Sequence, residues 1–114
     1  MTVLIAIHAG SPVGYVGLLP SVETSHASAG LYVSDLYVDE RYRGRGVGQR
    51  LMAAAASHAR MLGGRHLWLT MMPQNNAADR FYRRLADIRE PVIAFAVTGQ
   101  TFDELAEAGG DGIG

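Results

Sequence analysis

The chain has 114 residues, of which 48% are hydrophobic, with a net charge of −1 and a mean hydropathy of +0.06. This length supplies one hydrophobic core, so we expect a single domain over residues 1–114, with 109–114 as a frayed tail. No apolar run approaches the roughly 20 residues of a membrane span, and the N-terminus lacks the basic start of a signal peptide. Without cysteine there is no disulfide framework and no thiol nucleophile. We therefore expect a cytoplasmic protein with no membrane partner.

The charges are segregated along the chain. All ten cations are arginine, and nine of them lie between residues 41 and 84, where Asp79 is the one acidic residue. A basic middle of this kind suits an anionic ligand.

The N-terminal part of the chain predicts a β-hairpin. Residues 3–8 and 13–19 are apolar runs, and the Ala-Gly-Ser-Pro segment between them has turn chemistry. Gly14 and Gly17 inside the second run indicate a bulge or a close neighbour. Residues 20–30 are polar and predict a long loop, in which His26 is more often solvated than catalytic.

Residues 31–38 predict a third strand. Alternation puts Leu31, Val33, Asp35 and Tyr37 on one face, so that Asp35 interrupts an apolar surface. Two interpretations remain open for Asp35: a carboxylate at the strand end that meets an arginine, or a carboxylate that faces a reaction cleft.

A glycine-rich turn, Arg43-Gly44-Arg45-Gly46-Val47-Gly48, joins this strand to a predicted helix over residues 47–62. Glycines let the backbone approach a ligand, and the N–H groups and dipole of a helix N-terminus suit a phosphate. The arginines add charge-assisted donors. The alternative interpretation is a tight turn that glycine makes possible. The predicted inward stripe of the helix comprises Val47, Leu51, Ala54, Ala55 and Leu62, and Gly63-Gly64 ends it.

The remaining elements predict an α/β (α+β) fold. Residues 66–72 are apolar on both faces, which is typical of a central strand, and a helix follows over 76–85 with an Asn75 or Asn76 cap. Residues 92–98 predict a final strand, and residues 100–108 a short acidic helix whose Phe102 and Leu105 pack back. We expect a mixed, twisted sheet of about five strands flanked by two main helices, with the strands on either side of the first helix parallel.

Two motifs resemble those of a known family. Arg43-x-x-Gly46-x-Gly48 and the downstream Asn75-x-x-Ala78-x-x-x-Tyr82 resemble the two acetyl-CoA-contacting segments of the GNAT superfamily of N-acetyltransferases. The resemblance covers residues 3–98. It implies acetyl-CoA as the cofactor, and a bulge in strand 31–38 that opens a gap to the next strand for the pantetheine arm.

The resemblance also implies roles for individual residues. Tyr82 would donate a proton to the departing thiolate; otherwise it is a core-boundary aromatic beside Phe81. For the general base Asp35 comes first, followed by Tyr37, His8 and water. The residues that would contact coenzyme A are Leu36, Tyr37, Val38, Arg43, Gly44, Arg45, Gly46, Val47, Gly48, Asn75, Ala78 and Tyr82.

Three classes of function follow. The first is an acetyl-CoA-dependent N-acetyltransferase acting on a primary amine of a small molecule or peptide by direct attack, with no metal. The second is a catalytically inactive CoA-binding module that acts through a partner. The third, a nucleic-acid binder, is disfavoured because Arg50 and Arg60 do not share a helical stripe and the pI is about 6.4.

The family usually begins with a strand and two helices that form a wall of the acceptor site, whereas this sequence begins at the hairpin. We therefore expect a short member with an uncovered surface. The run Val3 to Ile7 is apolar and has no Lys or Pro to protect an edge, which predicts a homodimer through the hairpin or the final strand. Burial by residues 100–108 is the alternative.

Overall fold

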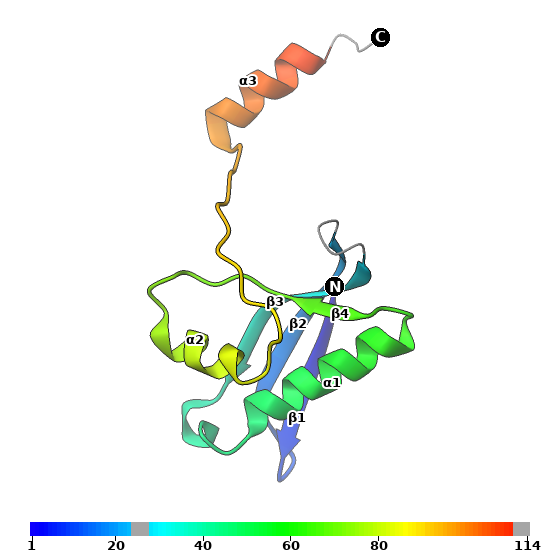
Figure 1. The fold of residues 1–114 in the computed structure, drawn as a ribbon, viewed down its shortest axis with the longest axis vertical. Helices are drawn as coiled ribbons and strands as arrows, with labels where there is room; N and C mark the ends of the chain where they lie inside the picture. The colour runs from blue at the N-terminus through cyan, green and yellow to red at the C-terminus, as the bar shows by residue number, and fades with distance from the viewer. Residues whose placement is uncertain (24–27, 111–114) are drawn as a thin grey trace. The chain divides into compact units, whose positions relative to one another are not determined.

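The computed structural model describes residues 1–23 and 28–110. The chain divides into two compact units, Met1–Met72 and Pro73–Gly114. The N-terminal unit contains a sheet and one long helix, and the C-terminal unit contains two helices (Figure 1). Within the described residues, no helix has both the length and the apolar character that a membrane crossing requires.

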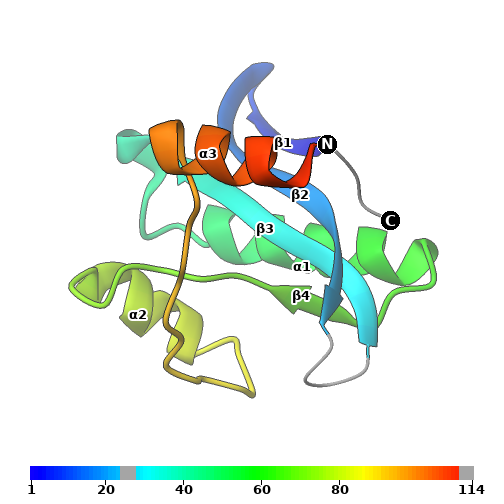
Figure 2. The same cartoon turned by 90° about the horizontal axis from the view of Figure 1, so that it is seen from above.

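The sheet has four strands in the order β1-β2-β3-β4. They are β1 (Thr2–His8), β2 (Ser11–Glu23), β3 (Ser28–Val38) and β4 (His66–Trp68). The first three pair antiparallel, and β3 pairs parallel with β4, to which it is joined through the helix α1 (Val47–Met61) (Figures 1 and 2). The predicted hairpin, the parallel pair and the mixed α/β class are confirmed.

Strands β2 and β3 are longer than the sequence predicted. The prediction of a loop over residues 20–30 is wrong for most of that range, because pairing continues from Pro20↔Leu31 to Glu23↔Ser28. Backbone pairing to a neighbouring strand overrides the polar composition here. His26 lies outside the described residues.

The helix α1 (Val47–Met61) contacts all four strands and covers one face of the sheet. Its buried residues follow a helical stripe of Leu51, Met52, Ala55 and Ala59, and Gly63 with φ +86° follows the helix end as predicted. Ala54 and Leu62 are exposed, so their predicted inward position is wrong. The core of this unit consists of Val13, Val16, Leu18, Leu31, Val33, Leu51, Met52, Ala55 and Ala59.

Glycines allow close backbone approaches at two points of this core. A Cβ on Gly14 would lie 2.7 Å from the Tyr37 carbonyl oxygen and 3.3 Å from Leu51 Cδ1, which confirms the predicted close neighbour. A Cβ on Gly30 would overlap the His66 carbonyl oxygen, where β3 meets β4. Side chains at either position would separate elements that carry the core.

The remaining elements differ more from expectation. The predicted strand 66–72 pairs only over His66–Trp68, is half-buried and forms the sheet edge rather than its centre. Residues 92–98 form no strand, and Ile93 and Phe95 are 86% and 92% exposed, so the sheet has four strands in the described chain rather than about five. A strand needs a backbone partner as well as a suitable composition, and no described strand pairs with residues 92–98.

The C-terminal unit contains α2 (Asn76–Arg83) and α3 (Gly99–Gly109), close to the predicted helices. Ala78, Phe81 and Tyr82 form the half-buried side of α2. The predicted packing of Phe102 and Leu105 is not seen, since these side chains are 55% and 61% exposed.

Candidate active site

The glycine turn leads from β3 through a short 3-10 turn, η1 (Glu40–Tyr42), into α1. Gly44 and Gly46 have φ of +77° and +82°, a left-handed conformation that side chains rarely adopt. A Cβ built on either glycine meets no atom within 4 Å. The turn therefore presents bare backbone to open space.

Gly46 is also the N-cap residue of α1 and offers no capping side chain. The first i→i−4 bond of the helix runs from Arg50 N to Gly46 O, at 3.1 Å. The N–H groups of Val47, Gly48 and Gln49 therefore have no acceptor within the helix, and its first turn contains no acidic residue. Three unpaired donors at the positive end of a helix dipole can bind an anionic oxygen.

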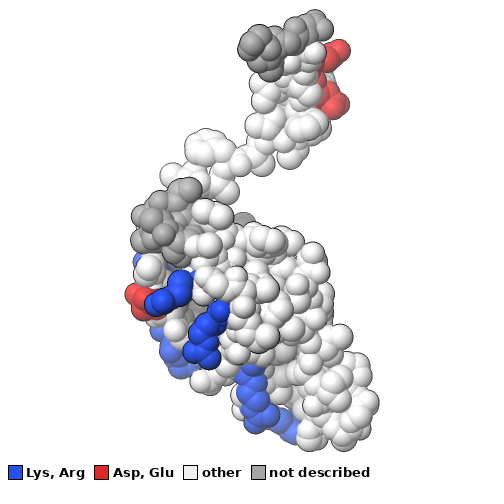
Figure 3. Space-filling model, turned by 90° about the vertical axis from the view of Figure 1, so that its right-hand side faces the viewer, with Lys and Arg blue, Asp and Glu red and all other residues white. Residues whose placement is uncertain are grey.

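Two arginines of the turn form no ion pair with the residues that the structure describes. Arg43 Nε donates to the Val38 carbonyl oxygen at 3.0 Å, and its guanidinium carbon lies 5.8 Å from the centre of the Tyr37 ring. Arg45 stacks over the Tyr42 ring at 5.4 Å. On the face drawn in Figure 3, several arginine side chains have no acidic side chain beside them.

Arg41 differs from these two because it pairs with a carboxylate. Its guanidinium lies 3.2 Å from Asp39 Oδ2. Hydrogen bonds from the Arg41 side chain and backbone lower the pKa of Asp39 below its ordinary value. Asp39 is therefore engaged with Arg41.

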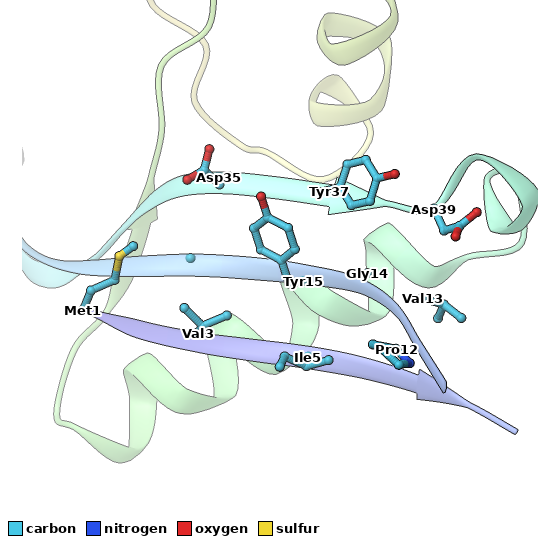
Figure 4. Close-up of a pocket in the computed structure, with 11 residues that line it drawn as sticks. Met1, Val3, Ile5, Pro12, Val13, Gly14, Tyr15, Asp35, Tyr37 and Asp39 are labelled. Carbon is cyan, nitrogen blue, oxygen red and sulfur yellow. The ribbon is translucent and has the colours of Figure 1, made fainter. Parts of the chain in front are cut away.

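A β-bulge in β3 decides which way Asp35 points. Gly17 pairs with Asp35 but the next residue of β2, Leu18, pairs with Val33, so Ser34 is the extra residue. The predicted alternation is therefore wrong: Asp35 and Tyr37 lie on the opposite face from the buried Leu31 and Val33 (Figure 4). The bulge itself agrees with the family resemblance.

The same part of β3 turns backbone groups away from β2. Asp39 N donates to Val13 O at 2.7 Å. In an antiparallel ladder every second pair is hydrogen-bonded, so the pair Tyr37↔Tyr15, two residues before Asp39, is hydrogen-bonded as well. The N–H and C=O groups of Leu36 and Val38 then point toward the side where β4 lies. The β3–β4 pairing ends at Tyr32↔Trp68, and the two chains diverge beyond it (Figure 2). Backbone donors and acceptors of β3 thus lie along the gap that opens between β3 and the chain that follows β4.

The sheet face opposite α1, here called the open face, has no helix packed on it within the N-terminal unit. A shallow depression of about 400 Å³ lies on this face, and its lining includes Val3, Ile5, Tyr15, Asp35 and Tyr37 (Figure 4). Tyr15 was not singled out from the sequence. Its cross-strand pairing with Tyr37 is the signal that identifies it, and that pairing depends on the register.

The candidates for the general base do not lie together. Asp35 and Tyr37 share the open face. Val3 on β1 lies level with Asp35, because both pair with Gly17 of β2, and His8 lies five residues further along β1. That offset is roughly 16 Å along a strand. The His8 ring instead contacts Tyr42, with centroids 5.5 Å apart.

In the C-terminal unit, Asn75, Ala78 and Tyr82 lie at the start and along one side of α2. Asn75, one of the two residues predicted for this position, is the N-cap, and its Oδ1 accepts from Ala78 N at 3.1 Å. The Tyr82 ring packs edge-on against Phe81, with centroids 5.0 Å apart. Burial raises the pKa of the Tyr82 hydroxyl, which keeps it protonated at neutral pH and able to donate.

A parallel β-α-β unit with a bare glycine turn at its helix N-terminus defines an α/β protein suited to a phosphate-bearing ligand. Comparisons with known proteins narrow this class. The sequence profile of the acetyltransferase (GNAT) family matches residues 1–86, and the chain therefore belongs to that family.

Individual relatives agree with this assignment. The chain is 28% identical over 78 residues to the spermine/spermidine N(1)-acetyltransferase of Bacillus subtilis (strain 168), covering 66% of this chain and 51% of that protein. The fold is similar to that of an integron cassette protein from V. cholerae, with a TM-score of 0.79 and 24% identity. The match covers 92% of this chain and 65% of that protein. A second similar structure is a Bacillus anthracis str. Ames protein, named as a streptothricin acetyltransferase and solved with acetyl coenzyme A. Its TM-score is 0.62 and its sequence identity 29%, and the match covers 72% of this chain and 44% of that protein. The chain spans about half the length of the B. subtilis relative.

Proposed function

We propose that this protein is an acetyl-CoA-dependent N-acetyltransferase that moves an acetyl group to a primary amine by direct attack. The observation that carries the proposal is the bare glycine turn and α1 N-terminus beside the separating strands β3 and β4. The B. anthracis neighbour, solved with acetyl coenzyme A, and the acetyltransferase relatives support it.

The residues of the turn fit the anionic end of this cosubstrate. The N–H groups of Val47, Gly48 and Gln49 would bind the pyrophosphate, and the open space above Gly44 and Gly46 leaves room for it. Arg43 and Arg45 would supply positive charge. The outward N–H groups of Leu36 and Val38 and the carbonyl of Leu36 would pair with the amides of the pantetheine arm, which would orient the thioester. The Val38 carbonyl oxygen already accepts from Arg43 Nε.

The cosubstrate supplies an acetyl thioester. In the transfer, a C–N bond forms between the amine and the acetyl carbonyl carbon, and the C–S bond breaks. An acceptor that binds as an ammonium ion loses two protons: a base takes one before the attack, and the loss of the other matches the proton gained by the sulfur. We assign proton acceptance to Asp35, on the open face, either directly or through water. We assign proton donation to the hydroxyl of Tyr82, which is protonated at neutral pH.

The acceptor would be a small molecule or peptide with a primary amine. The relatives named for spermine, spermidine and streptothricin support a small molecule. We further propose a cytoplasmic homodimer, since β1 is an edge strand with exposed apolar side chains. Asn75 and Ala78 would contact the cosubstrate from the start of α2, as the family motif implies.

Gly48 provides the sharpest test of donor binding. Gly46 is unsuitable because its φ of +82° would strain any substituted residue. Gly48 lies within α1 and has no positive φ, so Gly48→Ala should fold and bind acetyl-CoA. Gly48→Glu adds a carboxylate that favours the helix N-terminus but repels phosphate, and it should weaken binding at least tenfold in calorimetry.

Thiol release with a panel of primary amines then tests transfer itself. Release of coenzyme A that depends on the amine is expected from the wild type and from Gly48→Ala. Acetyl-CoA binding without any transfer would favour the inactive CoA-binding module. No binding, or equal binding by Gly48→Glu, would contradict the assignment of the glycine turn.

A further inference from the structure

We infer that the Tyr15–Asp35 part of the open face binds the acceptor as an organic ammonium ion with an apolar body, and that Tyr15 positions it. The inference rests on the proposed function, because it concerns the second substrate of that reaction. Tyr15 is then a specificity residue, and the acceptor is a cationic alkyl amine.

The charges that line the depression favour a cation. Among the described residues that line it are two carboxylates, Asp35 and Asp39, and no lysine, arginine or histidine. Asp39 is paired with Arg41 at 3.2 Å. Asp35 is exposed and makes no ion pair or hydrogen bond within the described residues, so its negative charge is available to a ligand. A cation beside it gains a favourable Coulomb interaction that a neutral ligand lacks.

The aromatic rings give the cation a second contact. Tyr15 and Tyr37 are cross-strand partners with ring centroids 5.8 Å apart and planes inclined by 33°. The Tyr37 ring already has the Arg43 guanidinium 5.8 Å from its centroid. A second cation is therefore favoured at Tyr15, whose hydroxyl end lies between Asp35 and Tyr37 (Figure 4).

The hollow beside Asp35 exists because its cross-strand partner is glycine. A Cβ on Gly17 would lie 3.8 Å from Asp35 Cβ and 2.9 Å from Ser34 Oγ, so a larger side chain would fill this space. The remaining lining is apolar, with Val3 and Ile5 on β1 49% and 58% exposed. A carboxylate and an aromatic ring at one end, with aliphatic side chains at the other, complement an alkyl ammonium ion.

The probe is n-hexyltrimethylammonium, which cannot be acetylated and so tests the site without turnover. We expect the wild type to bind it more tightly than n-hexanol in an NMR titration. Asp35→Asn, which keeps the shape of the side chain, should weaken ammonium binding at least threefold without changing hexanol binding. Tyr15→Leu should weaken it to a similar degree, whereas Tyr15→Phe should retain it. Asp103→Asn, on α3, is the matched control for loss of one exposed carboxylate.

The donor titration separates this inference from the proposed function. All these variants should bind acetyl-CoA with the wild-type affinity, because none belongs to the glycine turn. If acetyl-CoA fails to bind while the ammonium probe behaves as expected, the proposed function fails and the cation site stands. Equal affinity for hexanol and the ammonium ion, or no effect of Asp35→Asn, would overturn the inference. If Tyr15→Leu does not fold, the Asp35→Asn result decides.

Discussion

Asp35 lies directly opposite Gly17 across β2 and β3, and the pairing of the two strands shifts by one residue immediately beyond them. The extra residue, Ser34, has a buried hydroxyl oxygen with no hydrogen-bond partner in the described structure, and it lies against the bare backbone of Gly17. The bulge thus brings the carboxylate to the open face at the cost of one unsatisfied hydroxyl.

This relationship predicts a coupling between Gly17 and Ser34. Gly17→Ala should lower the free energy of unfolding by about 1–2 kcal/mol, because its Cβ would lie 2.9 Å from Ser34 Oγ. Ser34→Ala should be neutral or stabilising, since it removes a buried unpaired group. The double variant should recover most of the loss in urea unfolding. Additive effects of the two substitutions would contradict the contact.

Gly30 is predicted to be essential to the β3–β4 contact. In Gly30→Ala, the new methyl group would overlap the His66 carbonyl oxygen, so the strands must move apart. We expect a loss of about 3 kcal/mol or more in the free energy of unfolding, measured by chemical denaturation. Gly109→Ala is the control, because its Cβ meets no atom within 4 Å and its helix should gain slightly. Equal effects of the two substitutions would rule out the clash.

The sequence was most informative where structure is set locally. The glycine turn, α1 and the Asn75 cap were predicted because glycine conformation, helical periodicity and capping depend on neighbouring residues. The parallel β3–β4 pair followed from the handedness of a strand-helix-strand unit.

The errors concern relations between distant segments. Strict alternation cannot foresee an inserted residue, so it places Asp35 on the wrong face, and only the register with Gly17 reveals the right one. Strand composition alone predicted pairing over residues 92–98, which no partner supplies in the described structure. The role inferred for Tyr15 likewise depends on its cross-strand partner, Tyr37.

Tyr82 is expected to act on turnover rather than on binding. Tyr82→Phe removes the proton donor to sulfur and should lower kcat by roughly 100-fold, while the acetyl-CoA Kd stays within about twofold of wild type. The ring and its edge-on contact with Phe81 remain in this variant. Tyr42→Phe, which removes a hydroxyl beneath Arg45, is the control. Unchanged kcat in an assay limited by chemistry would remove Tyr82 from the mechanism.

Asp79 is expected to hold the chain that follows α2. It lies 3.1 Å from Arg89 Nε and 3.0 Å from Arg83 Nε, and hydrogen bonds from Arg89 and then Arg83 lower the pKa of its carboxyl below the ordinary value of 3.8. A lowered pKa stabilises the folded state above the unfolded pKa, and that contribution is lost as the pH falls through the folded pKa. The contacts should therefore be constant between about pH 5 and 8 and released only as the pH falls through a pKa below 3.8.

NMR titration of the Asp79 carboxyl tests this cluster directly. The midpoint should lie below 3.8 in the wild type and rise in Arg89→Gln. Arg80→Gln removes a cation from the same helix that does not bond Asp79, and it should leave the midpoint nearly unchanged. A wild-type midpoint at or above 3.8 would contradict the ion pairs.

The last prediction concerns the homodimer. The strand β1 is the outer strand of the sheet, and alternate residues Val3, Ile5 and Ile7 are 49%, 58% and 61% exposed. An edge strand left in water usually carries a charge or a proline, and Thr2 to Ile7 has neither. Light scattering at micromolar concentration should give twice 12.2 kDa. Ile5→Lys should shift the population to monomer, whereas Met61→Lys, at an apolar residue of α1 that is 80% exposed, should not. A wild-type monomer, or a dimer that Ile5→Lys leaves intact, would show that β1 does not form the interface.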